Sequence, residues 1–430
     1  MNYEQTLEYL FTKLPMFSRI GTAAYKADLD NTIRLCEFLD NPQQKFKSIH
    51  IAGTNGKGSV SHMLAAIFQT AGYKTGLYTS PHLKDFRERI RVNGDMISKS
   101  FVVDFTEKIK PLVIELEPSF FEITVALAFD YFQDEMVDIA IIETGLGGRL
   151  DSTNVITPEL SVITNIGMDH MNILGDTLEK ISGEKAGIIK EGVPVVVGET
   201  ETETKPVFEL TAKDKNAPLI IASQKRHAVD WKWNKHELIV EVAEENETDH
   251  KLYHLDLPGI YQRKNLITVL ETCHQLKLKG WKLEDETIRK ALRQVKKLTG
   301  LHGRWEVIHQ SPKIVLDVAH NEDGIRQLTE QIEVTDHHEL HVILGIVKDK
   351  DVERVLYQLP KNAHYYFTQA NIPRALDAES LQQMAEGYGL RGKVYNEVNE
   401  ALAFARSQAH KNDLIIVCGS VFLVGEVEPL

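Results

Sequence analysis

Short apolar runs alternate along most of the chain with longer stretches in which apolar residues recur at helical spacing. The run FKSIHIAG at 46–53 predicts a strand that enters a glycine-rich loop, and SVSHMLAAIFQTAG at 59–72 predicts the helix after it. Gly72 stands where a helix-ending glycine is expected. Further elements are predicted as strands at VDIAIIETG (137–145), ELSVITNIG (159–167) and VPVVVG (193–198), and as a helix at 176–192. Strands this apolar are typical of a mostly parallel sheet with both faces covered, so we predict an α/β fold.

A second alternating series follows the basic, glycine-bearing stretch Lys296–Arg304, where we place a domain boundary. The series comprises predicted strands at 313–319, 340–347, 363–370 and 413–420, and predicted helices at 324–333, 349–359 and 378–388. We therefore predict a first domain over 1–298 and a smaller, Rossmann-like α/β domain over 299–430, although no G-x-G-x-x-G opens a helix there. Residues 227–257 show the alternation of strands with polar turns, which predicts an antiparallel excursion at the edge of the first domain.

Composition narrows the class of protein. The chain has 430 residues, enough for two or three domains, and its net charge of -13 argues against nucleic-acid binding through a basic face. Its three cysteines form no CxxC pair, which favours a reducing cytoplasm over a disulfide framework. The N-terminal residues lack the pattern of a signal peptide, and the longest apolar run, near 414–425, is too short and interrupted for a membrane span. We expect a cytoplasmic monomer that binds neither nucleic acid nor membrane.

The stretch HIAGTNGKGSV at 50–60 resembles a phosphate-binding loop but departs from G-x-x-x-x-G-K-[ST] twice. Its first glycine is Gly53 instead of residue 51, and Gly58 occupies the place of the hydroxyl residue that normally binds Mg²⁺. Glycines allow backbone N–H groups to face phosphate oxygens, the next helix adds its positive end, and Lys57 reaches the β- and γ-phosphates. The alternative is a glycine-rich turn with a solvated lysine. The strand–loop–helix context favours a P-loop ATPase domain.

Polar residues at two further strand ends are candidates for a metal site. Glu143 ends one apolar strand, and Asp169 and His170 follow the next strand in the sequence. Ligands of open parallel sheets bind beyond the carboxyl ends of strands, and Mg²⁺ prefers oxygen donors shared with substrate phosphates. The alternatives are a solvated glutamate and a surface histidine. Lys185 on the predicted helix is, from sequence alone, best explained as a counter-charge.

Eight motifs in order carry a resemblance to a known family. They are GTNGKGS, YTSPHL, FRERI, ETGLGGRLDSTN, DHMNILGDTLEKISGEKAGIIK, HGRWE, DVAHNEDG and CGS, which span residues 53–420. Together they resemble the folylpolyglutamate synthase and dihydrofolate synthase family within the Mur ligase superfamily. The resemblance implies an ATP-dependent ligase that phosphorylates a carboxylate and joins the resulting acyl phosphate to the amino group of L-glutamate.

The resemblance also implies roles for individual residues. The ATP-binding set is Gly53, Thr54, Asn55, Gly56, Lys57, Gly58, Ser59, Asn265, Arg304, Asp317 and His320, with Arg304 and Asp317 supplied by the second domain, which closes on ATP and glutamate. The magnesium ligands are Ser80, Glu143 and His170, so Ser80 supplies the hydroxyl that Gly58 lacks. The catalytic residues are Lys57, Lys185 and His170, and Lys185 matches a lysine that is carbamylated in the superfamily.

Two segments resemble the pteroate-binding parts of members that perform both reactions. They are Ser119, Phe120, Phe121 and Glu122, and Leu150, Asp151 and Ser152 of GGRLDS. The implied acceptors are tetrahydrofolate and dihydropteroate. SFFE is equally the capping box of a helix start, with serine at the N-cap and glutamate three residues on.

Three other functions stay open at this point. One is polyglutamylation without dihydrofolate synthesis. Another is a Mur-type peptide ligase, which needs a UDP-binding domain where only about 50 residues precede Gly53. The third is a P-loop switch ATPase that makes no bond.

Overall fold

The computed structural model describes residues 1–16, 21, 26, 28–234, 237–245 and 249–429. The chain divides into two compact units. The first comprises 1–167, 171–256 and 262–301, and the second comprises 168–170, 257–261 and 302–430. The main division lies after Leu301, within the stretch Lys296–Arg304. The sequence did not predict that the short segments 168–170 and 257–261 belong to the second unit.

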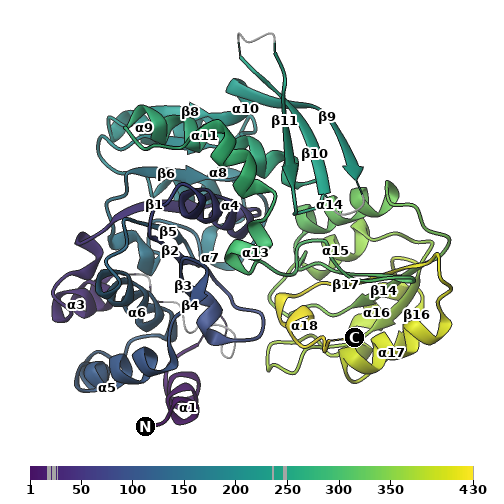
Figure 1. Ribbon diagram of the computed structural model, residues 1–430. Coiled ribbons are helices and arrows are strands. Elements are labelled where there is room, and N and C mark those ends of the chain that lie inside the picture. The colour runs from purple at the N-terminus through teal and green to yellow at the C-terminus, as the bar shows by residue number, and fades with distance from the viewer. Residues whose placement is uncertain (17–20, 22–25, 27, 235–236, 246–248, 430) are drawn as a thin grey trace. The chain divides into compact units, whose positions relative to one another are not determined.

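The first unit is built on an eight-stranded sheet in the order β4-β3-β2-β5-β1-β6-β7-β8 (Figure 1). Its strands are β1 (Lys47–Ala52), β2 (Thr75–Tyr78), β3 (Ile90–Val92), β4 (Asp95–Met96), β5 (Ile139–Glu143), β6 (Leu160–Ile163), β7 (Val195–Val197) and β8 (Leu219–Ile221). Six neighbouring strands from β2 to β8 run parallel, and β3 and β4 form an antiparallel edge. This confirms the mostly parallel sheet predicted from the apolar runs.

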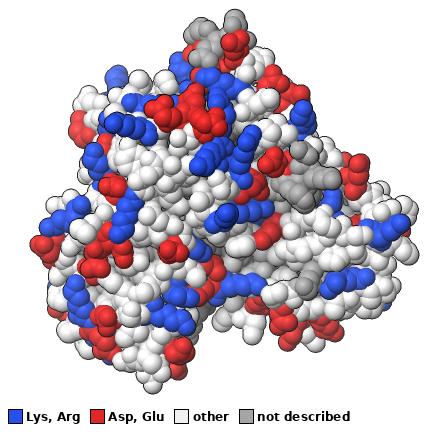
Figure 2. Space-filling view, viewed as in Figure 1, with Lys and Arg blue, Asp and Glu red and all other residues white. Residues whose placement is uncertain are grey.

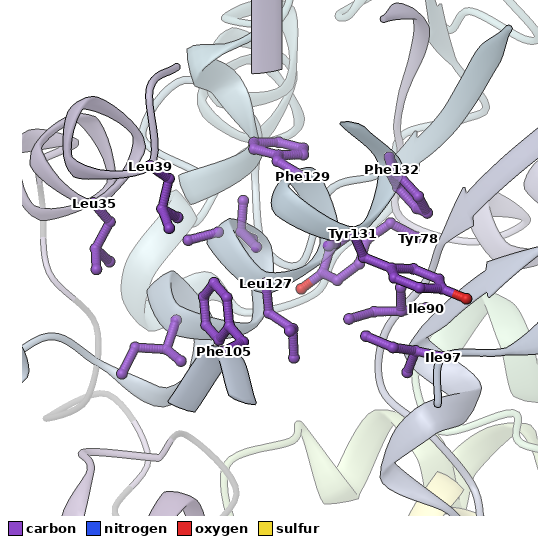
Figure 3. Packing of buried hydrophobic residues seen from close by; sticks show 14 of the residues in the cluster. Leu35, Leu39, Tyr78, Ile90, Ile97, Phe105, Leu127, Phe129, Tyr131 and Phe132 are labelled. Atoms are coloured by element: carbon purple, nitrogen blue, oxygen red, sulfur yellow. The ribbon is translucent and has the colours of Figure 1, made fainter. Parts of the chain in front are cut away.

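Helices cover both faces of this sheet, as the apolar strands require. On one face α4 (Lys57–Thr70) packs against β2 and β5 and is itself covered by α11 (Gln262–Leu278), α12 (Asp285–Leu292) and α13 (Val295–Thr299). On the other face, Tyr78 packs in a core with residues of α3 (Asp30–Phe38), α5 (Lys99–Leu116) and α6 (Phe120–Asp134) (Figure 3). Ala140 and Ile142 of β5 belong to the same core. The remaining helices are α1 (Tyr3–Lys13), α7 (Met171–Leu174), α8 (Leu178–Ala186), α9 (Lys205–Asp214) and α10 (Ala222–Lys225), with short 3₁₀ turns η2 (Pro42–Gln44), η3 (Phe86–Arg89) and η4 (Ser152–Val155).

The helix predicted over 176–192 is shorter than expected. It begins at Leu178 and ends at Ala186, with Gly187 as its C-cap. A Cβ on Gly187 would lie 2.3 Å from the Cβ of Arg149, so only glycine fits where the chain turns against the loop after β5. Ile188 and Ile189 then enter the core beside Ala52 and Ile163, which fixes them outside the helix.

The antiparallel segment forms a separate three-stranded sheet of β9 (Arg226–Asn234), β10 (Glu237–Glu244) and β11 (Lys251–Leu255). Its antiparallel pairing is as predicted. It does not extend the edge of the large sheet but packs against α11 and α12. Arg226 anchors it through buried ion pairs with Glu244 of β10 and Glu271 of α11.

The second unit holds a six-stranded sheet in the order β12-β13-β17-β14-β15-β16. Its strands are β12 (Glu306–Gln310), β13 (Lys313–Leu316), β14 (Leu340–Leu344), β15 (His364–Phe367), β16 (Gly392–Val394) and β17 (Leu414–Cys418). Its helices are α14 (Glu322–Glu333), α15 (Val352–Gln358), α16 (Ala378–Glu386), α17 (Val398–Gln408) and α18 (Val421–Gly425). The four predicted strands and three predicted helices are present. The antiparallel edge strand β12, the short β16 and the helices α17 and α18 were missed.

The surface agrees with the mixed composition. Figure 2 shows lysine and arginine side chains interspersed with aspartate and glutamate over the face in view. Among the described helices, none combines the length and apolar character needed to cross a membrane.

Candidate functional site

The carboxyl ends of β2, β5, β1 and β6 lie next to one another in the first unit and place the glycine loop at this edge (Figure 1). The loop leaves β1 after Ala52, and Gly56, with φ 84°, is the N-cap of α4. The end of β6 holds the loop in place. Thr54 N donates to Asn165 O at 3.0 Å, Asn55 N donates to Asn165 Oδ1 at 2.8 Å, and Thr164 Oγ1 donates to Asn55 O at 2.5 Å.

Two glycines of the loop combine a positive φ with the close approach of a neighbouring side chain. Gly53 has φ 151°, and a Cβ there would lie 1.9 Å from Thr164 Oγ1. A Cβ on Gly56 would lie 2.3 Å from Oδ1 of Asn265. The structure thus brings Asn265, from α11, against the glycine loop. Such a loop at a helix N-terminus has the form of an anion-binding site.

Both candidate catalytic lysines meet at one backbone carbonyl. Lys57 Nζ donates to Gly53 O at 3.0 Å and to Thr54 O at 3.2 Å. Lys185 Nζ, 4% exposed at residue level, donates to the same Gly53 O at 2.9 Å. As unmodified lysines, these two side chains give an acidic protein a local positive charge beside the loop that is suited to phosphate.

The loop after β5 positions Lys185. A Cβ on Gly148 would lie 2.9 Å from the carbonyl oxygens of Glu184 and Lys185, so the glycine backbone packs directly on the end of α8. Arg149 completes the contact with an ion pair to Glu184 at 2.8 Å. The glycine pair of ETGLGGRLD therefore fixes the helix that carries Lys185.

Ser80 and Glu143 lie together at the ends of β2 and β5. Ser80 N is 3.4 Å from Glu143 Oε2, and the glutamate is buried. Glu143 also interacts with the charge of the buried Arg89. Burial lowers the pKa of the Arg89 guanidinium, and the Glu143 carboxylate is among the groups that act to raise it. By contrast, the hydroxyl of Ser59 is buried within α4 and accepts a hydrogen bond from Gln262 Nε2 at 3.1 Å. A buried carboxylate beside a serine offers the hard oxygen donors that fit Mg²⁺.

His170, the third candidate ligand, belongs to the second unit. There its Nε2 lies 3.3 Å from Lys350 Nζ, which also contacts Asp169 Oδ1 at 2.5 Å. Asn321 Nδ2 donates to Asp169 Oδ2 at 3.0 Å, and His320 Nε2 lies 3.6 Å from the same oxygen. Burial would raise the pKa of Asp169, but Lys350 and the two histidines hold it well below its usual range.

Lys350 and Asn321 were missed by the sequence analysis. A signal for Lys350 existed, because the polar run KDKD begins at Lys348, with only three residues between it and the carboxyl end of the parallel strand β14.

Asp317 and Arg304 also lie in the second unit. Asp317 is buried and accepts from Tyr261 Oη at 2.8 Å, Trp305 N at 2.8 Å and Ala319 N at 2.9 Å. Burial raises its pKa, against which these donors act. Arg304 donates to Gly303 O at 3.2 Å. Asp317 thus organises its own unit, a role the sequence did not suggest.

The first pteroate candidate segment packs against the loop that leads to the second. A Cβ on Gly145 would lie 2.4 Å from the ring of Phe121, so α6 and the loop after β5 are in close contact. Ser119 and Glu122 form the predicted capping box, with Ser119 N donating to Glu122 Oε2 at 2.6 Å. The ring of Phe120 packs with Phe11 and Phe86.

Asp151 is engaged within its own loop. Its Oδ2 accepts from Leu146 N at 2.8 Å, and its Oδ1 accepts from Thr153 N at 3.0 Å. Leu150 and Ser152 flank it, half-buried and buried respectively. Asp151 therefore fixes the loop that faces Phe121.

Comparisons with known proteins cover nearly the whole chain. Residues 51–273 match the family described as Mur ligase middle domain, and 303–421 match the Mur ligase, glutamate ligase domain. The chain is 35% identical over 416 residues to the Bacillus subtilis dihydrofolate synthase/folylpolyglutamate synthase, covering 94% of each. It is 31% identical to the Lacticaseibacillus casei folylpolyglutamate synthase, covering 99% of this chain and 98% of that protein.

Solved structures agree with the sequence relatives. The Mycobacterium tuberculosis folylpolyglutamate synthase complexed with ADP matches with a TM-score of 0.87 and 28% identity, covering 100% of this chain and 99% of that one. The E. coli FolC protein in complex with DHPP and ADP matches with a TM-score of 0.83 and 28% identity, covering 99% and 96%.

Proposed function

The chain belongs to the folylpolyglutamate synthase and dihydrofolate synthase family of Mur ligases, and we propose that it adds L-glutamate both to tetrahydrofolates and to dihydropteroate. Its shared family activity is the ATP-dependent ligation of glutamate to folates. The observation that carries the proposal is the glycine loop with Lys57, Lys185 and Asn265 gathered around it. Activity on both acceptors is supported by the GGRLD sequence, which resembles that of members performing both reactions. It is also supported by Gly145, just before this sequence, which packs against Phe121.

The proposed reaction proceeds through an acyl phosphate. The acceptor carboxylate attacks the γ-phosphorus of ATP, ADP leaves, and the glutamate amine then displaces phosphate from the acyl carbon. Such chemistry needs charge neutralisation and positioning more than a protein nucleophile. Backbone N–H groups of the loop and the start of α4 orient the phosphates. When ATP binds, Lys57 Nζ leaves the carbonyl oxygens of Gly53 and Thr54 and contacts phosphate oxygens instead.

Ser80, Glu143 and His170 are the residues that would hold Mg²⁺. When bound with ATP, the ion neutralises phosphate charge during transfer. Ser80 and Glu143 suit this role because a serine hydroxyl and a glutamate carboxylate are oxygen donors. The two residues are neighbours, with Ser80 N 3.4 Å from Glu143 Oε2. His170 remains a proposed ligand from the family resemblance.

Lys185 is proposed to act as a carbamate. The hydrogen bond to Gly53 O is compatible with this modification, because a carbamate nitrogen keeps one N–H to donate. The modification would replace a positive charge by a negative one and supply two further oxygens. Arg304, Asp317 and His320 are also proposed to bind ATP or glutamate. That the protein is a monomer in the cytoplasm remains a prediction.

Phosphate release tests the ligase against a P-loop switch ATPase. Release from ATP should require both glutamate and an acceptor, either dihydropteroate or a tetrahydrofolate. Lys57→Ala protein, prepared identically, measures contaminating ATPase. Release by the native protein that ignores all three substrates would refute the ligase. Phosphate release that occurs with tetrahydrofolate and glutamate but not with dihydropteroate and glutamate would show polyglutamylation only.

A further inference from the structure

Three potential metal-binding side chains converge at the amino ends of strands in the second unit. Glu339 precedes β14, His341 is its second residue, and Asp413 precedes β17. One donor atom from each lies within 4.8 Å of the other two. Asp317 and Lys350 follow the carboxyl ends of β13 and β14. The cluster therefore lies at the opposite, amino ends of the strands of this sheet.

His341 presents an unpartnered nitrogen to this cluster. The residue is 2% exposed, and its Nδ1 lies 2.8 Å from Tyr366 Oη. Nε2 is buried, and no atom of the described residues forms a hydrogen bond with it. It faces Asp413 Oδ2 at 3.6 Å, beyond hydrogen-bond distance. If Nδ1 donates to the tyrosine oxygen, Nε2 offers its lone pair to an ion, which is how metal-bound histidines are usually oriented.

The two carboxylates are held differently. Asp413 is fully buried, and its oxygens accept from Glu339 N at 3.1 Å and His410 N at 2.5 Å. Glu339 is half-exposed and contacts His364 Nε2 at 2.9 Å. His338, largely exposed, lies 3.7 Å from Asp413 Oδ1. The site is therefore rigid at Asp413 and open to solvent at Glu339.

We propose that Glu339, His341 and Asp413 form a binding site for a divalent transition-metal ion of the zinc class. One imidazole and two carboxylates are a ligand set that zinc accepts at tetrahedral geometry, with a fourth position for water. The imidazole favours such an ion over Mg²⁺ or Ca²⁺, which take oxygen ligands. Tyr366 and His364 orient the ligands through hydrogen bonds to His341 and Glu339.

Zinc binding to the full chain tests this site. Protein stripped with chelator is titrated with Zn²⁺, and bound zinc is counted after dialysis. Glu339→Gln removes the exposed ligand without disturbing the core. Glu241→Gln is the matched control, because Glu241 forms a similar exposed pair with His250 at 2.7 Å. We expect Glu339→Gln to bind one zinc ion fewer per chain, or that ion at least about tenfold more weakly, and Glu241→Gln to match the native protein.

Cobalt provides a second measurement that reports on the ligands directly. The native protein should give a visible d–d absorption with Co²⁺ that Glu339→Gln and His341→Gln lose. If His341→Gln does not fold, Glu339→Gln decides alone. Equal zinc stoichiometry and affinity in the native protein and Glu339→Gln would overturn the proposal, as would zinc loss that Glu241→Gln reproduces.

Discussion

Lys185 Nζ donates a 2.9 Å hydrogen bond to the carbonyl oxygen of Gly53, which joins α8 to the first glycine of the phosphate loop across 132 residues of sequence. The same oxygen accepts from Lys57 Nζ at 3.0 Å. Removing Lys185 therefore affects both the loop and any oxygen atoms that a carbamate would supply.

Lys185→Ala should lose ligation almost completely. If a carbamate is the active form, formate should restore part of the rate, because a small carboxylate replaces the missing oxygens. The measurement is product formation with and without formate. Lys180→Ala is the control, since Lys180 lies on the same helix with a 62% exposed side chain and pairs with the exposed Asp176. A fully active Lys185→Ala would contradict the role, and inactivity without rescue would contradict the carbamate.

The two serines near the loop should respond differently to truncation. Ser80→Ala should raise the Mg²⁺ concentration needed for half-maximal activity by about 10-fold or more. Ser59→Ala loses its hydrogen bond with Gln262 and should cost about 1 kcal/mol of unfolding free energy with an unchanged Mg²⁺ requirement. Mg²⁺ titrations of activity, with urea unfolding of each variant, separate the effects. The reverse pattern would assign the metal hydroxyl to Ser59.

Gly56→Ala should impair ATP use because its Cβ would collide with Asn265. The control is Gly72→Ala, where φ is 90° but nothing lies within 4 Å of the added Cβ. Both variants carry the strain of a left-handed residue, about 1–2 kcal/mol. Only Gly56→Ala should also raise the KM for ATP or abolish activity. Equal KM values in both variants would show that the glycine is needed for backbone angle alone.

Acid should destabilise the first unit through His50 of β1. Burial, and secondarily the charge of Lys190, lower the pKa of His50 to about 3. Its unfolded pKa is about 6.5. The unfolded state therefore binds the proton first, so stability falls by about 1.4 kcal/mol per pH unit as pH drops from 6.5 toward 3. Urea unfolding of the native protein and His50→Gln at pH 7 and pH 5 measures this.

The difference in unfolding free energy between pH 7 and pH 5 is expected to be smaller in His50→Gln than in the native protein, by up to about 2 kcal/mol. The variant also loses the contact between His50 Nε2 and Thr153 Oγ1 at 2.8 Å, which lowers stability equally at both pH values. An identical pH difference in both proteins would show that His50 does not titrate on unfolding.

The parts of the fold that sequence predicts well depend on local pattern. The strand–loop–helix at 47–70 follows from an apolar run, glycines and helical spacing within one segment. The hairpin of β3 and β4 was missed although Asn93 and Gly94, with φ 50° and 86°, form a common turn signal. Its strands have only three and two residues, too few to show alternation.

The parts that sequence did not predict depend on distant contacts. Lys350 and Asp169 are 181 residues apart, and Tyr261 and Asp317 are 56 apart. No local pattern identifies such pairs. The early end of α8 has a similar cause, since Gly187 is required by packing against Arg149 and not by helix propensity.

We propose above all that this chain forms an amide bond between glutamate and each of two acceptors, dihydropteroate and a tetrahydrofolate. The most direct measurement is mass spectrometry of the products after incubation with ATP, Mg²⁺, L-glutamate and either dihydropteroate or a tetrahydrofolate. We predict the mass of one added glutamate on dihydropteroate and of at least one on the tetrahydrofolate. An unchanged mass for dihydropteroate would remove the first activity, and unchanged masses for both acceptors would contradict the account.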